Sequence, residues 1–218
     1  DDSTRGISVT HGVCPRYSDI DTYAMAQCAV DEAFRAHIAL GGDPEQAGAL
    51  DNFCWPDPVQ SENTPDGEYK MAQLVRACRG LRDICDVYSL PLISGKDSMK
   101  NDARLAGHKV SVRPTLLVTL MGIVPDVTAC RNTDFMAAGD TIFMVGITRD
   151  ELGGSRLEAA YQEGRVTLPP ASSAGAAAAG TPATAATTTY EDLYANRSIL
   201  GEYVDIVLGD CPRAVPEE

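Results

Sequence analysis

The chain has 218 residues, of which 44% are hydrophobic and 22% are charged, proportions typical of a globular protein. Lys and Arg number 18 against 31 Asp and Glu, and the net charge of −13 argues against binding of nucleic acid through a basic face. No apolar stretch approaches the roughly 18 residues that a membrane helix needs. The first residue is Asp1 rather than Met, so we expect a piece of a longer protein.

The seven cysteines are irregularly spaced and include no C-x-x-C pair. This pattern argues against a zinc site and against a disulfide framework. Thiols scattered through apolar surroundings are typical of small buried side chains in a reducing compartment, so we expect a cytoplasmic protein.

The first half of the chain alternates between predicted strands and helices. Alternating residues 6–10 predict a strand, and Asp19 or Asp21 is expected to cap a helix that ends before Gly41 and Gly42. A buried strand is predicted at 47–53, followed by a polar excursion at 59–68. Residues 91–95 predict a third strand.

A second long helix is predicted over about 69–88, between the polar excursion and the third strand. Its expected apolar stripe consists of Met71, Leu74, Val75, Cys78, Leu81, Ile84, Cys85 and Tyr88. We expect Leu74, Val75, Leu81 and Ile84 to pack against the sheet.

A second domain is predicted from residue 113 to residue 218, after a first domain at 1–112. It would begin with strands at 115–124 and 141–146 and a helix that opens at 151–155 and runs to about Gln162. Residues 171–189 are all Ala, Ser, Gly, Thr or Pro, which predicts a low-complexity insert over about 165–189.

The segment 92–101, LISGKDSMKN, combines a strand end, a glycine and three polar side chains. Glycine allows a ligand to approach the backbone, while Lys96 could hold a phosphate, Asp97 a magnesium ion and Ser98 a phosphate oxygen. The Walker pattern is absent, which excludes a P-loop. Taken alone, Gly-Lys-Asp-Ser is more typical of a plain turn than of a ligand site.

Three further residues are candidates for the same site. Asp51 follows a buried strand, where a carboxylate is costly unless it is paired or binds a metal, although it could also merely cap the loop. Arg16, ahead of the first helix, could grip an anion or form a surface salt bridge. Glu32 could face the same edge or be a solvated helical charge. Because Asp51 and the 92–101 segment both end strands, we expect them to converge.

Together these segments resemble phosphoribosylformylglycinamidine synthase, over about residues 6–162. The resemblance rests on the runs PRYSD at 15–19, CAVDEA at 28–33, LDNFCW at 50–55, LISGKDSM at 92–99 and DELGGS at 150–155. It implies an α+β fold: an N-terminal-type domain of the aminoimidazole ribonucleotide synthetase kind, with helices on a mixed or antiparallel sheet, followed by part of a C-terminal-type α/β domain. The chain would be the second of two such copies.

The activity that the resemblance implies is an ATP-dependent ligase of purine biosynthesis. ATP phosphorylates the formamide oxygen of formylglycinamide ribonucleotide, and ammonia from a glutaminase domain or subunit displaces the phosphate. ATP and Mg²⁺ are the implied cofactors, and the first synthetase-like repeat and the glutaminase are the implied partners. The family's catalytic histidines belong to the first copy, so we expect this chain alone to be inactive.

The resemblance also assigns roles to single residues. Asp51 and Gly95 would bind ATP, Ser98 would bind the ribonucleotide, and Glu32 would bind the metal. The residue pattern adds Lys96 to the expected ATP-binding residues, and Asp97 and Arg16 to those expected to bind the ribonucleotide. Two departures concern metal binding. Lys96 stands where the short form has a magnesium-binding Asn, and Ala36 stands where the long form has an Asn.

Two alternatives remain open on the sequence. A degenerate repeat that binds a nucleotide, or only supports the active half, would also explain Lys96 and Ala36. Another enzyme of the same superfamily, such as a selenophosphate or hydrogenase-maturation protein, is disfavoured because its Gly-rich, Asp-containing ATP motif is absent.

Overall fold

The structure is a computed structural model that describes residues 3–134, 137–139, 141 and 153–165. Residues 3–134 belong to one compact unit, and residues 153–165 belong to another. The insert expected at 165–189 and the tail that follows it lie outside the described residues, as does nearly all of the strand expected at 141–146.

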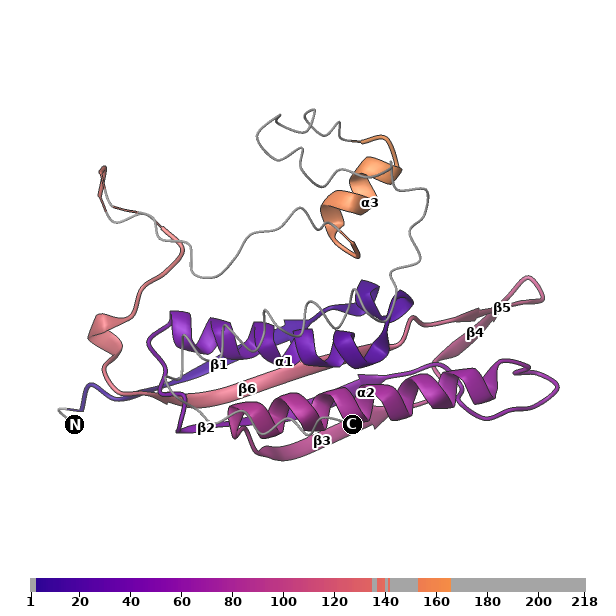
Figure 1. Ribbon diagram of the computed structural model, residues 1–218, viewed down its shortest axis with the longest axis horizontal. Helices are drawn as coiled ribbons and strands as arrows, with labels where there is room; N and C mark the ends of the chain where they lie inside the picture. The colour runs from indigo at the N-terminus through magenta and orange to yellow at the C-terminus, as the bar shows by residue number, and fades with distance from the viewer. Residues whose placement is uncertain (1–2, 135–136, 140, 142–152, 166–218) are drawn as a thin grey trace, which may run out of the picture. The chain divides into compact units, whose positions relative to one another are not determined.

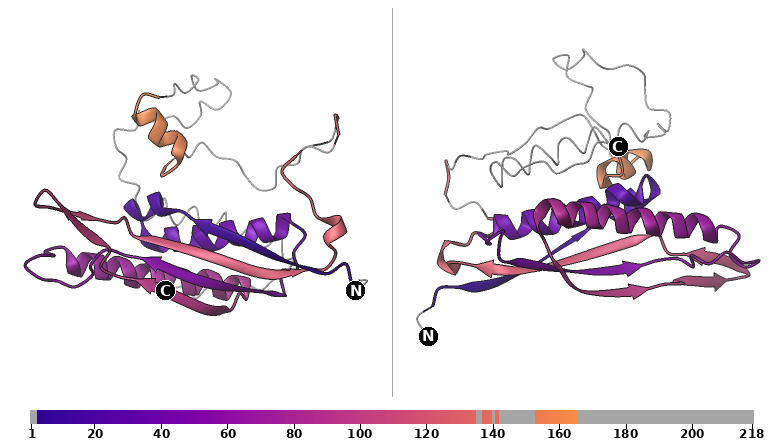
Figure 2. Two further views of the ribbon diagram at one scale, coloured as in Figure 1. Left: turned by 180° about the vertical axis from the view of Figure 1, so that it is seen from behind. Right: turned by 60° about the horizontal axis from the view of Figure 1, so that its bottom comes forward.

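The first unit is an α+β layer of helices on a mixed sheet, as predicted (Figure 1). The order of elements is β1 (Gly6–Val13), η1 (Pro15–Asp19), α1 (Thr22–Ala39), β2 (Ala47–Cys54), α2 (Gly67–Tyr88), β3 (Leu92–Ser98), β4 (Asp102–Leu105), β5 (His108–Ser111), β6 (Thr115–Val124) and η2 (Val127–Ala129). Both long helices lie on one face of the sheet, which leaves the other face open (Figure 2).

The four-stranded sheet has the order β1-β6-β2-β3, with β6 antiparallel to both of its neighbours and β2 parallel to β3. The sequence predicts a domain boundary between residues 112 and 113, but the sheet is continuous across it. Because β6 forms the centre of the sheet, the boundary of the first unit lies after β6 and not before it.

Helix α1 begins at its predicted cap and packs closely on the sheet. The Asp21 side chain accepts a hydrogen bond from the Tyr23 N–H at 3.0 Å, which satisfies a free donor of the first turn. Gly12 of β1 lies beneath the helix, where an added Cβ would stand 1.8 Å from the Ala29 carbonyl oxygen. Only glycine at this position permits so close an approach of helix and strand.

Helix α2 packs on α1 more closely than on the sheet, so its apolar stripe differs from the predicted one. Leu81 and Ile84 are buried as expected, but Val75 is 44% exposed. At Gly80 the two helices approach so closely that an added Cβ would stand 2.3 Å from the Tyr23 carbonyl oxygen. Hence the predicted packing of Val75 against the sheet is wrong.

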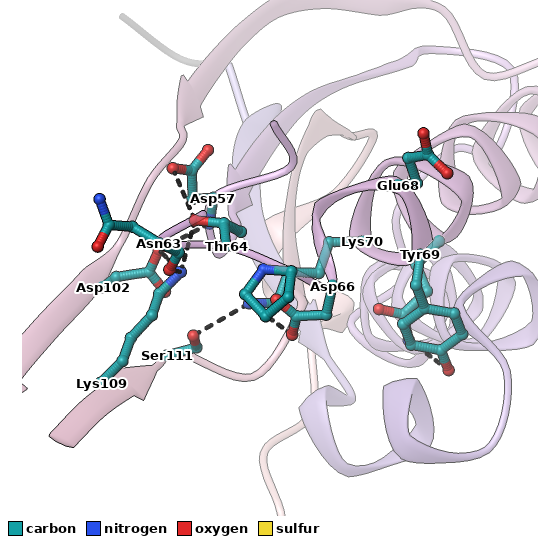
Figure 3. A network of polar contacts seen from close by, with 12 residues as sticks. Asp57, Asn63, Thr64, Asp66, Glu68, Tyr69, Lys70, Asp102, Lys109 and Ser111 are labelled. Atoms are coloured by element: carbon teal, nitrogen blue, oxygen red, sulfur yellow. Dashed lines mark hydrogen bonds and ion pairs between the residues drawn. The ribbon is translucent and has the colours of Figure 1, made fainter. Parts of the chain in front are cut away.

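Strands β4 and β5 form a hairpin that no sequence pattern predicted, and a polar network anchors it (Figure 3). Lys70 of α2 is only 7% exposed; its Nζ lies 3.0 Å from Asp66 Oδ2 and donates to Ser111 Oγ at 3.1 Å. Lys109 Nζ lies 3.2 Å from Asp102 Oδ2. These contacts join the start of α2 to the base of the hairpin.

The second unit contributes one described helix, α3 (Arg156–Gln162). The Ser155 side chain caps it by accepting a hydrogen bond from the Glu158 N–H at 3.0 Å. The helix ends where the sequence predicts, at Gln162. In the parts of the chain that the structure describes, no helix is both long and apolar enough to span a bilayer.

Candidate nucleotide site

The two strand motifs converge as expected. In the parallel pairing of β2 with β3, Asp51 stands opposite Gly95 and Phe53 opposite Asp97. Residues paired in this way project to the same face of a sheet. Asp51 therefore shares one face of the sheet with Gly95 and Asp97, although about forty residues separate the two strands' motifs in the chain.

Gly95 leaves room for the Asp51 carboxylate. An added Cβ at Gly95 would lie 2.7 Å from Asp51 Oδ1 and 2.9 Å from Oδ2. Real Cβ atoms do not approach oxygen so closely, so any larger residue would push the carboxylate out of its position. Gly95, which lies within β3, thus shapes the surroundings of Asp51.

A cavity of about 550 Å³ lies between α2 and the β2–β3 pair, within the usual range for small-molecule sites. Its walls are mainly apolar, with four charged side chains among them. The lining residues are Asp51 and Phe53 from β2; Leu74, Cys78, Leu81, Arg82, Cys85 and Asp86 from α2; and Leu90, Pro91, Leu92, Asp97 and Met99 from β3 and its flanks.

The α2 side of this cavity was not foreseen from the sequence. The sequence predicts Leu74, Cys78 and Leu81 as positions of a helix packed on the sheet, and it does not predict that they also line a cavity. Arg82 and Asp86 belong to none of the sequence motifs described above.

Burial dominates the electrostatics of the cavity. It raises the pKa of the Asp51 carboxyl above its usual value; a backbone hydrogen bond opposes this, and the nearby carboxylate of Asp97 adds to it. Burial also raises the pKa of the Cys85 thiol to about 12, with further contributions from Asp86 and Asp51. The charged forms of Asp51 and Cys85 are therefore disfavoured in this space.

Lys96 and Ser98 belong to the opposite face of β3. Side chains alternate along a strand, so these two residues project away from the face that carries Gly95 and Asp97. Neither lines the cavity, and the Lys96 ammonium donates a hydrogen bond to the Ser98 hydroxyl. The predicted Gly95–Ser98 site is thus divided between the two faces of an edge strand.

Arg16 lies in η1, just after β1, and Glu32 contacts the end of β1; neither lines the cavity. Glu32 Oε2 accepts a hydrogen bond from the Val13 N–H at 2.8 Å, so the carboxylate clamps the strand end. Arg16 Nε is buried and has no hydrogen-bond partner among the described residues. Burial, with Cys28 and Glu32 nearby, raises the pKa of the Cys14 thiol to about 12.

The described ranges contain no group of three or more His, Cys, Asp or Glu side chains placed to hold a metal ion. Magnesium in nucleotide sites is commonly held by one or two carboxylates together with phosphate oxygens and water. These residues therefore do not form a self-sufficient metal site, and the metal role expected for Glu32 stays a prediction.

The family described as AIR synthase related protein, N-terminal domain, matches residues 2–124. The phosphoribosylformylglycinamidine synthase subunit PurL of Thermoplasma volcanium is 32% identical over 155 residues, covering 71% of this chain and 19% of that protein. The same subunit of Deinococcus radiodurans is 32% identical over 144 residues, covering 66% of this chain and 18% of that protein.

Solved structures of Thermotoga maritima PurL are also similar. The complex with FGAR is 21% identical, with a TM-score of 0.49, and covers 60% of this chain and 19% of that one. The complex with ATP is 24% identical, with a TM-score of 0.45.

These findings confirm the resemblance that the motifs predict, although the chain matches only part of each relative. The chain spans about a fifth of the curated relatives that it matches. The matched family region ends at residue 124, which is also the last residue of β6. The chain belongs to the AIR synthase related proteins, and residues 2–124 form their N-terminal domain.

Proposed function

We propose that the chain is part of a phosphoribosylformylglycinamidine synthase and forms one wall of its ATP and ribonucleotide site. The observation that carries the proposal is the pairing of Asp51 with Gly95 beside a cavity of ligand size. The curated relatives, which bear that enzyme's name, support it.

The reaction that follows from this proposal is the ATP-dependent conversion of formylglycinamide ribonucleotide to its amidine. Phosphorylation of the formamide oxygen turns it into a leaving group, which ammonia derived from glutamine displaces. Phosphoryl transfer depends mainly on positioning and on neutralising the phosphate charge. Mg²⁺ supplies part of that neutralisation when it is bound.

The roles of the chain's own residues are binding and orientation. Asp51 accepts hydrogen bonds from the nucleotide, and Gly95 keeps the space around its carboxylate open. Lys96 places a positive charge at the free edge of the sheet, where it attracts phosphate. The Ser98 hydroxyl, beside Lys96, is a hydrogen-bond partner for the ribonucleotide.

The open face of the sheet supports the proposed partner, a first synthetase-like repeat. Its exposed apolar side chains come from both β1 and β6, and include Ile7 at 67%, Val9 at 53% and Met121 at 43% exposure. A contiguous apolar face of this kind is typical of a protein–protein interface. The glutaminase that supplies ammonia is proposed as the second partner.

The proposal is tested by the kinetics of the whole protein with Asp51→Ala and Ser98→Ala. We expect the first to raise KM for ATP and the second to raise KM for the ribonucleotide, each by about tenfold or more, since each removes a charge or hydroxyl that contacts ligand. Glu45→Ala, at an exposed carboxylate of the α1–β2 loop, is the control. Unchanged kinetics in both test variants would reject the proposal.

A further inference from the structure

The cavity and the Lys96 cation lie on opposite faces of β3, and this division bears on how a nucleotide is oriented. We propose that the cavity between α2 and the β2–β3 pair takes the base and ribose of the nucleotide, and that the phosphates lie outside it, over the free edge of β3 toward Lys96. This inference rests on the proposed nucleotide site and adds the orientation of the ligand within it.

The charges inside the cavity exclude a triphosphate. Three carboxylates line it, from Asp51, Asp86 and Asp97, against the single guanidinium of Arg82. That guanidinium is already engaged, since Arg82 Nε donates to Asp83 Oδ1 at 2.9 Å. Phosphates would meet an excess of negative charge in a partly desolvated space, where like-charge repulsion is strongest.

The same lining suits a nucleoside. Carboxylate oxygens accept hydrogen bonds from the hydroxyls of a ribose and from the amino group of a base. The apolar walls, including Phe53, Leu81 and Met99, suit the faces of an aromatic ring. Burial disfavours the charged form of Asp51, and a hydrogen bond donated by a ligand hydroxyl or amino group would offset that cost.

The edge position of β3 makes the path of the ligand possible. The sheet ends at β3, and residues 92–97 of this strand are all exposed. A ligand in the cavity therefore meets no further strand on that side, and its phosphates reach the face that carries Lys96 by passing over the edge. On that face Lys96 and Ser98 offer an ammonium and a hydroxyl.

The test introduces a tryptophan that fills the cavity of the whole protein, at a position exposed enough to tolerate it. The binding of adenosine is then measured by calorimetry. Cys78→Trp places an indole in the cavity, whereas Val75→Trp, on an exposed part of the same helix, does not. Leu92→Trp and Ile93→Trp form a second matched pair on β3, because Leu92 lines the cavity and Ile93 does not. The second pair decides the result if Cys78→Trp fails to fold.

We expect each cavity variant to weaken the binding of adenosine by about tenfold or more, while its control leaves the affinity unchanged. We also expect inorganic tripolyphosphate not to compete with adenosine, and Lys96→Ala to weaken ATP but not adenosine. The inference is overturned if adenosine does not bind, if tripolyphosphate displaces it, or if the cavity variants bind it like their controls. The kinetics of Asp51→Ala and Ser98→Ala test the proposed function separately.

Discussion

The charged carboxylate of Asp51 opposes folding, and its position is one that a ligand can contact. Its carboxylate is half-buried beside Asp97, and both burial and this neighbour favour the protonated form. A carboxyl whose pKa is raised by folding stabilises the protein only while it is protonated. That stabilisation is complete below the unfolded pKa of about 3.9 and is lost as the pH rises through the folded pKa.

Asp51→Asn is therefore expected to raise the stability of the chain at pH 7, because it removes a charge that opposes folding. The gain should shrink as the pH falls toward about 4, where the wild-type carboxyl becomes protonated. Urea unfolding between these pH values measures it, with Glu45→Gln as an exposed control. A variant less stable than wild type at pH 7 would contradict this account of Asp51.

Gly95→Ala tests the contact between the two strand motifs. The new Cβ would stand 2.7 Å from Asp51 Oδ1, so the carboxylate must move away. Because it is the end of a side chain that moves, we expect a small change in stability and a clear rise in KM for ATP, of about tenfold. Ser94→Ala, on the opposite face of β3, should leave the KM unchanged. Equal effects of the two substitutions would refute the assignment.

The sequence predicted Asp51 and Gly95 together because both motifs end strands that were expected to be neighbours. It did not predict that Lys96 and Ser98 project from one face of β3 while Gly95 and Asp97 lie on the other. The motif was interpreted as a turn, in which consecutive side chains gather at one edge. In a continuing strand, which β3 is up to Ser98, they alternate.

At the scale of elements, the close approach of α1 to β1 depends on glycine. Gly12→Ala would place a Cβ 1.8 Å from a backbone carbonyl oxygen of the helix, which cannot rotate away. We expect a loss of about 1–3 kcal/mol in the free energy of unfolding, measured with urea. Gly48→Ala is the matched control, because its nearest neighbour is the flexible Ile93 side chain at 3.2 Å. Similar losses in both variants would show that helix packing is not the cause.

The sequence predicted the type of each element better than it predicted which strands pair in the sheet. Residues 115–124 form a strand with the predicted bounds, because a long apolar run is a strong local signal. Its place at the centre of the first sheet depends on pairing with β1 and β2, which periodicity does not encode. The β4–β5 hairpin was missed because its tip is Ala106-Gly107, which lacks the Asn-Gly or Asp-Gly signal.

For the molecule as a whole, the open sheet face predicts that residues 3–134 do not act alone. Burying exposed side chains such as Val9 and Met121 against a first repeat would remove a large apolar area from water. We expect Val9→Glu to abolish copurification with that repeat, because an unpaired carboxylate in an interface is costly. Tyr69→Glu, at an exposed position of α2, is the control.

The result for Val9→Glu is informative because Val9 is exposed in this chain. The substitution should change the free energy of unfolding of the isolated chain by no more than about 0.5 kcal/mol. Copurification of Val9→Glu at the wild-type level would show that the open face is not the interface.

The most direct test of the account is a crystal structure of the whole protein with a non-hydrolysable ATP analogue. The account predicts that the Asp51 carboxylate and the Gly95 backbone line the bound nucleotide, with its phosphates on the Lys96 side of β3. A nucleotide bound elsewhere, with the space between α2 and β3 filled only by water, would contradict it.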